Sequence, residues 1–358
     1  MMSEQSIANF RCLCRASLRI MLGLVIATWI GACSKQASAP QDALRVQVFT
    51  GAYSSIPLHV ASEQGFFERH GLEVELLAAN SSSAAIAAMI GGSMDIVESG
   101  ADLVMANIDK GTKLKYLMSN ESTNYVSVVV GNHVDLSGSS NEYPAVVANF
   151  AGHRIGVNAI GSTVYLAALL MLEDAGLSAD DVEFVATGSA ATTMAAWRAD
   201  SVDVQITFAP VPQLLESKNI ARRMFVLADE GPPALRFNGL YGGWVTTDEF
   251  IQNRAAVADA FIAAMSESID WIRDPANSES MLAIAMRHAP VSALTDKENT
   301  AVIAKMIEQY RRYWGYQISP QAIEMWNDYA LRFELIERPI AFDEIVYAGA
   351  PTCADRCR

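Results

Sequence analysis

Polar residues suited to binding chemistry gather in short turns of this sequence, and each turn is followed by a segment with a helical pattern. Hydroxyl, amide and glycine residues make up GAYSS (51–55), NSS (80–82), SG (99–100) and GST (161–163). Hydroxyls and backbone N–H groups at a helix start donate hydrogen bonds, and the helix dipole there favours anionic or electron-rich groups. Each turn taken alone is better explained as a helix cap. Their recurrence in two halves of the chain favours a shared cleft for a small ligand.

The sequence carries no recognisable catalytic, cofactor-binding or metal-binding motif. It has no GxGxxG after a strand, no P-loop, no HExxH and no paired CxxC. The acidic residues Asp95, Glu98 and Asp203 do not have the spacing of an acid/base pair. The scattered histidines are interpreted as surface or packing residues: His59, His70, His133, His153 and His288. We therefore expect a protein without catalysis, cofactor or metal.

The cysteines lie outside the part of the chain expected to fold. Between residues 34 and 352 there is none, so a cysteine nucleophile is not available there. The tail pair Cys353 and Cys357 allows two interpretations: a small disulfide in an oxidising compartment, or two thiols without a role in ligand binding.

The N-terminus has the organisation of a bacterial lipoprotein signal. Three arginines precede the apolar run 20–30, which is short for a membrane span and leads into the lipobox-like sequence IGAC, ending at Cys33. We predict a signal peptide over 1–32, lipid including palmitate on Cys33, and a flexible tether over 33–43. The alternative is an ordinary signal peptide in which the cysteine stands by chance.

The charge balance excludes one class of partner. With 26 Lys and Arg against 40 Asp and Glu, the formal net charge is −14. Such a chain is repelled by phosphate backbones, and it has no basic stretch with interleaved aromatics, so we expect no nucleic-acid binding. A hydrophobic content of 51% and 358 residues suffice for two globular lobes.

The elements that would position the polar turns recur after about 108 residues. In the first half, a strand at 44–51 precedes a helix at 57–71, a second strand, a small-residue helix and a short strand. In the second half, a strand at 154–159 precedes a helix at 164–177, and strand, helix and strand follow. Aligned pairs are Gly71-Leu72 with Gly176-Leu177, Val74-Glu75 with Val182-Glu183, and Met94-Asp95 with Val202-Asp203.

This repeat predicts an α/β fold of two lobes, each a mainly parallel sheet flanked by helices. The apolar stretch 125–131 and the extended stretch 240–247 are the expected crossings of a hinge. We expect lobe I over 44–128 plus 243–345, lobe II over 129–242 and a tail over 346–358. Helices of the C-terminal third are expected to cover the first lobe.

An ordered series of motifs runs through both halves. It comprises Tyr53…Pro57, EQGFFERHGLEVEL (63–76), the Ser-rich turn 80–83, GGSMDI, ESGA (98–101), FAGHRIGVNAIGST (150–163), LMLEDAGLSADDVEFVATG (170–188) and MAAWRADSVDVQITFAPVPQLLE (194–216). The series resembles the nitrate/sulfonate/taurine and thiamine-pyrimidine-precursor branch of ABC-importer substrate-binding proteins, over roughly residues 44–340. The resemblance implies a periplasmic-binding-protein fold, type II-like, that clamps a small ligand between its lobes and performs no chemistry.

The resemblance also implies a set of ligand-binding positions. They are Tyr53, Ser54, Asn80, Ser81, Ser82, Ser99, Gly161, Ser162, Thr163, Gly188, Phe208, Pro210 and Trp244. None is Lys or Arg, whereas Tyr53 and Trp244, with Glu98 nearby, suit a flat or amine-bearing ring. A pyrimidine-like or amine-bearing organic ligand is therefore favoured, and a sulfonate, taurine or nitrate stays open as the alternative.

The partners implied by the resemblance are an ABC permease and its ATPase, with the protein a monomer held extracytoplasmically at a membrane by its lipid. One alternative is a ligand-sensing subunit for a membrane receptor. Another is an enzyme on the same fold, either a thiamine-pyrimidine synthase with a cysteine-rich motif or a desulfinase with a cysteine nucleophile. The lack of cysteine between residues 34 and 352 and the export signal count against both enzymes.

Overall fold

Strands from both ends of the folded chain build the first lobe. In this computed structural model β1 and β2 pair in parallel, and a separate sheet has the order β3-β10-β4, with β10 antiparallel to both neighbours. A bridge between Val46 and Ile96 connects the two sheets. The strands are β1 (Leu44–Val48), β2 (Val74–Ala78), β3 (Val97–Gly100), β4 (Leu114–Glu121) and β10 (Gly242–Thr247).

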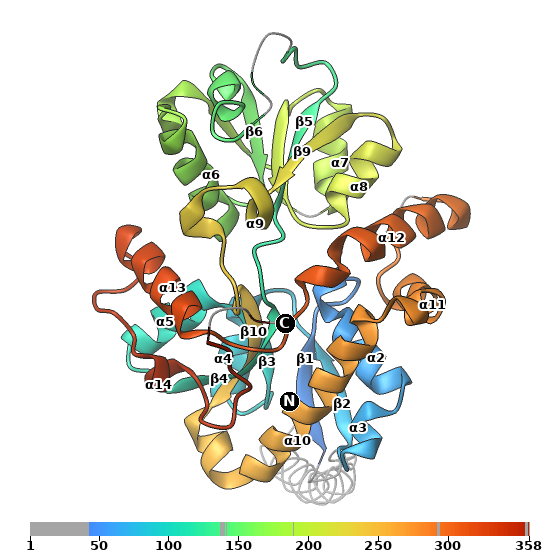
Figure 1. Cartoon of the computed structure of the whole chain (residues 1–358), viewed down its shortest axis with the longest axis vertical. Coiled ribbons are helices and arrows are strands. Elements are labelled where there is room, and N and C mark those ends of the chain that lie inside the picture. Colours follow the sequence, from blue (N-terminus) through green and yellow to red (C-terminus); the bar gives the residue numbers. More distant parts are fainter. Residues whose placement is uncertain are drawn as a thin grey trace, which may run out of the picture. The chain divides into compact units, whose positions relative to one another are not determined.

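The second lobe is one sheet of five strands in the order β7-β6-β8-β5-β9. Strand β6 runs parallel to β7 and β8, while β5 runs antiparallel to β8 and β9. The strands are β5 (Ser127–Gly131), β6 (Arg154–Val157), β7 (Glu183–Ala186), β8 (Val204–Thr207) and β9 (Ala221–Val226). Figure 1 shows helix α6 on one side of this sheet and α7 and α8 on the other.

The helices of the two lobes follow the expected order along the chain. In the first lobe and the C-terminal region they are η1 (Tyr53–Ser55), α2 (Ile56–Glu63), α3 (Phe66–Arg69), α4 (Ser82–Ile90), α5 (Ala101–Asp109), α10 (Asp248–Arg273), η5 (Pro275–Asn277), α11 (Ser278–His288), α12 (Asp296–Tyr310), η6 (Arg311–Tyr313), α13 (Pro320–Arg332) and α14 (Phe342–Ile345). In the second lobe they are η2 (Val147–Phe150), α6 (Thr163–Asp174), η3 (Ala179–Asp181), α7 (Ala190–Arg198), α8 (Val211–Ser217), α9 (Leu227–Glu230) and η4 (Pro233–Leu235).

The structure describes residues 43–136, 140, 142–188, 190–291, 294–354 and 357, and the chain from Leu44 onward is one compact unit. The predicted signal peptide (1–32), the predicted lipidation site Cys33 and all but the last residue of the predicted tether lie outside the described residues. Among the residues that the structure describes, no helix is long and apolar enough to cross a membrane.

The α/β class and the two lobes are confirmed, but the sheets are mixed rather than mainly parallel. The chain passes between lobes twice, from Glu121 to Ser127 and from Val226 to Gly242, and both connections are visible in Figure 1. Each crossing segment contributes a strand, β5 or β10, that runs antiparallel to its neighbours. The expected boundary between 128 and 129 falls inside β5, because that strand begins at Ser127.

The internal repeat is visible as a matching ion pair in each lobe. Arg45 binds Asp95 through its backbone N, Nε and Nη2, with Nη2 2.7 Å from Oδ1, and it donates from Nη1 to the carbonyl of Gly92. Arg154 binds Asp203 through the same three groups, again with Nη2 2.7 Å from Oδ1. These two Arg–Asp clasps tie the first strand of each repeat to the turn before its third strand.

One expected helix is divided in two. The predicted helix over 57–71 consists of α2 and α3, because Gly65 between them has a φ of 69°. That left-handed conformation is accessible to glycine without steric cost and interrupts the helical backbone.

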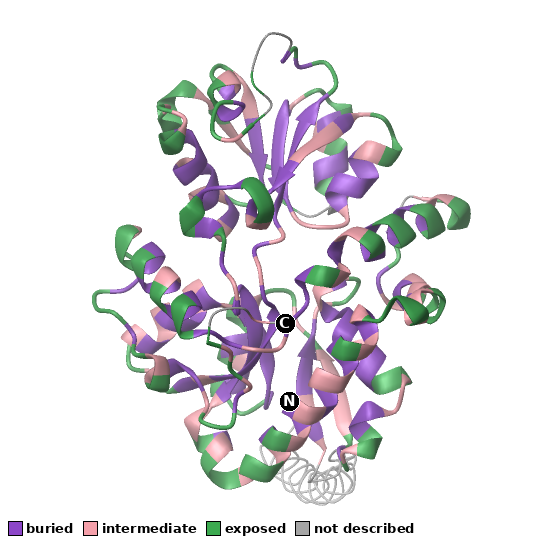
Figure 2. Cartoon of the chain, viewed as in Figure 1, coloured by how far each residue is buried: buried purple, intermediate pink, exposed green. Residues whose placement is uncertain are grey.

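Burial follows the sheets, as Figure 2 shows in purple for the strands of both lobes. The fully buried side chains include Leu44, Ile56, Ile96 and Tyr116 in the first lobe and Phe150 in the second. Burying such side chains contributes about 25 cal/mol per Å² of apolar surface. The buried side chains form two clusters, and each cluster contains residues of both lobes.

The C-terminal helices do more than cover the first lobe. Helix α12 also contacts α8 of the second lobe, where Lys305 lies 2.6 Å from Glu216 and Gln213 donates to Gln309. A disulfide joins Cys353 to Cys357 in the tail, which is the first of the two interpretations left open by the sequence.

Candidate functional site

A cavity of about 290 Å³ lies between the two lobes. The first lobe lines it with residues of β3, β4, α4 and α5, and the second lobe with residues around the start of α6 and the end of β8. Tyr125 and Tyr241 line it from the two crossings, and Trp326 from α13. The cavity is therefore formed by both lobes and by the segments that connect them.

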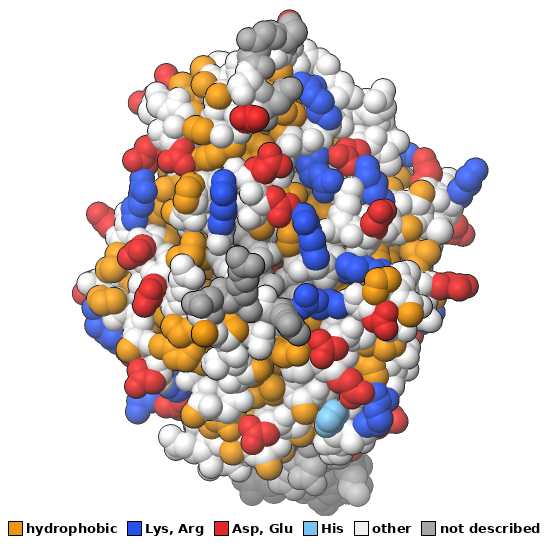
Figure 3. All heavy atoms as spheres, viewed as in Figure 1, with side chains coloured by type: hydrophobic (Ala, Val, Ile, Leu, Met, Phe, Trp, Pro, Cys, Tyr) orange, Lys and Arg blue, Asp and Glu red, His pale blue; other side chains and the backbone are white. Residues whose placement is uncertain are grey.

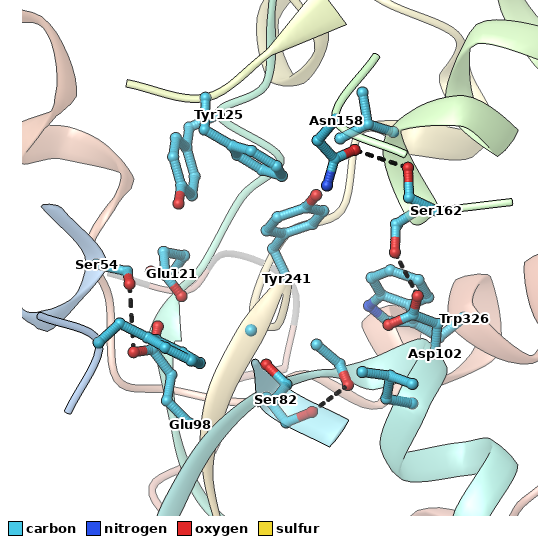
Figure 4. A pocket seen from close by; sticks show the side chains of 18 residues that line it. Ser54, Ser82, Glu98, Asp102, Glu121, Tyr125, Asn158, Ser162, Tyr241 and Trp326 are labelled. Atoms are coloured by element: carbon cyan, nitrogen blue, oxygen red, sulfur yellow. Dashed lines mark hydrogen bonds between the residues drawn. The ribbon is translucent and has the colours of Figure 1, made fainter. Parts of the chain in front are cut away.

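Two helix starts line this cavity because of local capping. The side chain of Ser162 accepts a hydrogen bond from the backbone N of Tyr165 and begins α6. Its hydroxyl also lies 2.7 Å from Oδ1 of Asn158, as Figure 4 shows. Ser81 caps α4 in the same way through the backbone N of Ala84, which leaves Ser82 to line the cavity.

Six of the predicted ligand-binding residues line the cavity. They are Ser54, Ser82, Ser99, Ser162, Thr163 and Phe208. They come from the turns predicted at helix starts and strand ends, so the expected convergence of these turns on one space is observed.

The remaining predicted residues do not line the cavity. Asn80, Ser81, Gly161 and Gly188 are exposed, and Pro210 is half-buried at the start of α8. Ser81 has the capping role that was the alternative interpretation of its turn.

The two rings expected to stack on a ligand, Tyr53 and Trp244, are packed inside the protein. Tyr53 is 5% exposed and stacks on Trp314 with ring centroids 4.6 Å apart. Trp244 is completely buried and meets Phe261 edge to face at 5.7 Å. On the antiparallel strand β10, Gly242 faces the cavity, and the bulky ring at 244 belongs to the core.

Several lining residues were not predicted. They are Phe49, Gly100, Asp102, Leu103, Glu121, Tyr125, Asn158, Val164, Tyr241, Gly242 and Trp326, together with Glu98, which was expected only nearby. The polar run Ser119–Ser122 at the end of an apolar strand was a usable signal for Glu121, since it follows the same rule as the predicted turns.

The most unusual feature of the cavity is a pair of buried carboxyl groups, Glu98 and Glu121. They are 5% and 4% exposed. The amide of Asn120 lies between them, with its Nδ2 3.2 Å from Oε1 of each glutamate. Ser54 donates from its hydroxyl to Oε2 of Glu98 at 3.3 Å. Figure 4 shows Glu98, Glu121 and Ser54 together on one side of the cavity.

Burial controls the protonation of this pair. It raises the pKa of Glu98 to about 7, while hydrogen bonds with Glu121, Asn120 and Ser54 oppose the rise. Burial also raises the pKa of Glu121 well above its ordinary value, and the charge of Glu98 and a hydrogen bond with it raise it further. Two adjacent buried carboxyl groups cannot both ionise easily, so the pair holds a shared proton near neutral pH.

Gly242 leaves room for this pair. A Cβ atom at position 242 would lie 3.0 Å from Oε2 of Glu121. That is closer than ordinary van der Waals contact, so a side chain here would displace the carboxyl group.

A third carboxyl group lies on another side of the cavity and connects the lobes. Thr163 at the start of α6 donates a hydrogen bond to Oδ2 of Asp102 on α5. Burial raises the pKa of Asp102, and the hydrogen bond from Thr163 opposes this shift. Tyr329 of α13 donates to the carbonyl of Thr163 at 3.3 Å, so the start of α6 is held by two elements.

Aromatic rings form another wall. Tyr125 lies 5.5 Å from Phe208 and 6.0 Å from Tyr241 between ring centroids, and Tyr241 lies 6.0 Å from Trp326. The indole N–H of Trp326 is satisfied by the carbonyl of Leu240 at 2.8 Å. Rings in such an arrangement offer apolar surface and negative π faces to a ligand.

No cationic side chain is found among the described residues that line the cavity. Lys and Arg side chains are visible on the outer face in Figure 3, dispersed among acidic ones. The cavity therefore combines three carboxyl groups with aromatic rings and hydroxyls.

A second acidic cluster lies away from the cavity. His133, Asp200 and Asp203 have possible ligand atoms within 4.8 Å of one another. Asp203 is already bound by Arg154 at 2.7 Å, and the hydrogen bonds from the Arg154 side chain lower the pKa of that carboxyl group. A cation there would have to compete with a guanidinium group, so the cluster is better explained as part of the Arg–Asp clasp.

Two α/β lobes joined by two crossings, with a cavity between them, define the class of this protein. It has the fold of the periplasmic binding proteins. A family profile described as NMT1/THI5 like matches residues 53–278, which is more than half of the chain. The chain therefore belongs to the NMT1/THI5-like family.

Solved structures confirm the fold at low sequence identity. The periplasmic aliphatic sulphonate-binding protein SsuA from Escherichia coli is 18% identical with a TM-score of 0.68, over 87% of this chain and 99% of that one. The alkanesulfonate-binding protein SsuA from Xanthomonas axonopodis pv. citri, bound to MOPS, is 18% identical with a TM-score of 0.65, over 87% and 99%. The desulfurization enzyme DSZB is 16% identical with a TM-score of 0.60, over 86% and 97%.

No curated protein matches the sequence. Because binding proteins and an enzyme share this fold, the fold alone does not identify the ligand.

Proposed function

We propose that this protein is the extracytoplasmic solute-binding subunit of an ABC importer. It captures a small organic molecule between its lobes and delivers it to a membrane permease driven by an ATPase. The observation that supports this most directly is the cavity of about 290 Å³ between lobes joined by two crossings. That volume is in the range of small-molecule sites, and rotation about the crossings would open and close it.

The same proposal includes the division of the chain. Residues 1–32 are a signal peptide, Cys33 carries the lipid and residues 33–43 are a tether. The lobes follow, with the expected boundaries at 128/129 and 242/243 moved to the starts of β5 at Ser127 and of β10 at Gly242. The protein acts as a monomer, because capture between its own lobes needs no second copy.

A binding role is preferred to catalysis on the fold of the desulfurization enzyme. The sequence has no cysteine between residues 34 and 352 to serve as a nucleophile. Glu98 and Glu121 are held by an amide and a serine hydroxyl, and no histidine or lysine lines the described cavity to work with them.

The capture function is tested by native mass spectrometry of freshly purified protein. We expect a small molecule to co-purify with the parent and to be lost from Ser82→Trp, which fills the cavity from α4. The matched control is Ser83→Trp, the next residue of the same helix, which is exposed and does not line the cavity. The proposal fails if Ser82→Trp and the parent behave alike in this measurement and in binding of any added solute.

Anchoring is tested separately with labelled palmitate. The native protein should incorporate the label, and Cys33→Ala should not. Equal labelling of both proteins would show that Cys33 is not the lipidation site.

A further inference from the structure

Resting on the proposed binding function, we propose that the cavity takes a small organic cation. Its protonated nitrogen binds to the Glu98–Glu121 pair from the cavity side, and its hydrocarbon part packs against Tyr125, Phe208 and Tyr241.

The geometry of the carboxyl pair supports a cationic partner. An ionised carboxylate has about four acceptor positions, whereas the donors to this pair are one amide group, one serine hydroxyl and the proton that the two carboxyl groups share. Both groups are at least nine-tenths buried, so bulk water does not easily supply the rest. A buried carboxylate without a cationic partner is unfavourable, and among the described lining residues there is no Lys or Arg to provide one.

Tyr241 provides an independent indication of a ligand. It is 9% exposed and stands within the cavity, as Figure 4 shows. Its hydroxyl has no hydrogen-bond partner among the described residues, although the ring packs against Tyr125 and Trp326. A hydroxyl without a protein partner in the lining of a cavity between lobes is suited to a polar group of a bound molecule.

The same surroundings disfavour an anion. A sulfonate or nitrate at this position would face Glu98, Glu121 and Asp102 with no basic side chain among the lining residues to offset them. An organic cation instead gains from the carboxylates and from the π faces of the aromatic wall. The ligand chemistry thus differs from that named for the sulfonate-binding structures of the same fold.

Binding of a cation should release a proton. The titratable groups on which the charge of the pair acts are Tyr116 from β4 and Tyr125 and Tyr241 from the crossings. Tyr53, Tyr310 and Tyr313 line a small space together with Glu121, and Asp102 from α5 lines the cavity itself. Burial raises the pKa of Tyr116, Tyr125 and Tyr241 well above their ordinary values, so these phenols stay neutral. The proton exchanged on binding therefore comes from a carboxyl group, in the first place from the Glu98–Glu121 pair that the cation contacts, and affinity should increase as the pH rises.

The test is calorimetry with probes of matched shape and different charge. Benzamidine (cation), benzamide (neutral) and benzenesulfonate (anion) share one ring, and phenethylammonium, agmatine and cadaverine extend the cations. We expect at least one cation to bind with Kd below about 1 mM, and benzamide and benzenesulfonate to bind at least tenfold more weakly than benzamidine.

The apparent enthalpy should vary with the ionisation enthalpy of the buffer, as proton release requires. Affinity should rise up to about tenfold per pH unit between pH 5.5 and 7.5.

Amide variants of the pair identify the residues responsible. Glu98→Gln and Glu121→Gln should each raise the Kd of the bound cation about 10- to 100-fold, because each removes a charged acceptor. The matched control is Glu73→Gln, an exposed glutamate outside the cavity, which should leave the Kd unchanged. Each variant is checked for an intact fold by its unfolding midpoint.

The outcomes separate this inference from the proposed function. If benzenesulfonate, ethanesulfonate or nitrate binds and no cation does, the cationic ligand is overturned while solute binding stands. If cations bind but the double variant Glu98→Gln, Glu121→Gln binds them as the parent does, the assignment to this pair is wrong. If neither added probes nor a co-purifying solute bind, and Ser82→Trp changes nothing, the solute-binding function itself fails.

Discussion

At the scale of single residues, Glu98 and Glu121 oppose the stability of the fold. Two carboxyl groups that are 5% and 4% exposed lose most of their hydration, and their like charges repel when both ionise. Nothing in the packing of β3 and β4 requires acids at these positions, since glutamine has nearly the same shape. The pair lowers the free energy of unfolding, and a role in ligand binding explains why acids occupy these two positions.

This cost predicts a pH-dependent stability of the ligand-free protein. Because the folded-state pKa of both groups is raised above the unfolded value of 4.5, the folded protein holds more protons between pH 4.5 and about 7. The contribution of Glu98 to the free energy of unfolding is thus fully present below pH 4.5 and is lost as the pH rises through about 7, and the raised pKa of Glu121 acts in the same direction. Urea unfolding at pH 5, 6, 7 and 8 should show this loss.

In the double variant Glu98→Gln, Glu121→Gln that loss should disappear. At pH 8 the variant should be more stable than the parent by about 1–3 kcal/mol, since no buried carboxylate has to ionise. Glu73→Gln is the control for a change of net charge alone. Parallel pH profiles for parent and double variant would contradict the assigned cost.

Single residues were also the hardest part to predict from the sequence. Ser54, Ser99 and Thr163 were found because they stand in polar turns after strands. The two glutamates were not found as a pair, because β10 from a distant part of the chain lies between β3 and β4. For Trp244, an aromatic residue in the right segment suggested stacking, but β10 has register shifts against β4 at Gly242/Gly243 and at Trp244/Val245, and the ring is completely buried in the core.

At the scale of elements, the order of strands and helices in each lobe could be predicted from the sequence because the two halves of the chain repeat it. In both halves an arginine at the start of the first strand binds an aspartate before the third, and the pairs Arg45–Asp95 and Arg154–Asp203 have almost the same geometry. The sequence alignment had matched the two aspartates but not their arginine partners. The directions of β5 and β10, which follow the two crossings, were less predictable. They depend on the side from which the chain enters each sheet.

The clasp of the second lobe predicts a specific loss of stability. Arg154→Met removes three side-chain hydrogen bonds, two of them to a carboxylate that is 7% exposed. We expect the free energy of unfolding to fall by about 1–3 kcal/mol near pH 7. The parent itself should lose this contribution in acid below about pH 3.8, because Arg154 holds the pKa of Asp203 below its ordinary value of 3.8.

The matched control is Arg198→Met, an exposed arginine on α7 of the same lobe. It should change the unfolding midpoint in urea little, because exposed charges contribute less than about 1 kcal/mol. Equal effects of Arg154→Met and Arg198→Met would show that the clasp does not stabilise the lobe.

At the scale of the whole folded unit, the lobes meet on more than one side of the cavity. Helix α12 reaches α8 through the pairs Lys305–Glu216 and Lys218–Glu298. Elsewhere Thr163 reaches Asp102 and Tyr329. The sequence predicted two lobes and two crossings, but these contacts join residues far apart in the chain and depend on how the lobes are placed.

The two crossings predict a change of shape on binding, because the lobes can rotate about them. Solution scattering should give a smaller radius of gyration when the bound solute, for example the tightest cation of the calorimetric panel, is added at saturation. The physical reason is that a ligand contacting both lobes stabilises the conformation in which they are close. An unchanged scattering profile at saturation would remove closure as the mechanism and leave binding itself intact.

The hydrogen bond from Thr163 to Asp102 should set how strongly the closed conformation is favoured. Thr163→Val keeps the shape of the side chain but removes the donor and leaves a buried carboxyl group without it. Losing about 1–3 kcal/mol of contact between lobes would shift the ligand-free protein toward open forms, with a larger radius of gyration. The Kd of the bound cation should then rise about 5- to 100-fold, since the competent state is less populated.

Thr163→Ser retains the hydroxyl and should behave like the parent in both measurements. If Thr163→Val raises the Kd without expanding the ligand-free protein, Thr163 acts on the ligand and not on closure.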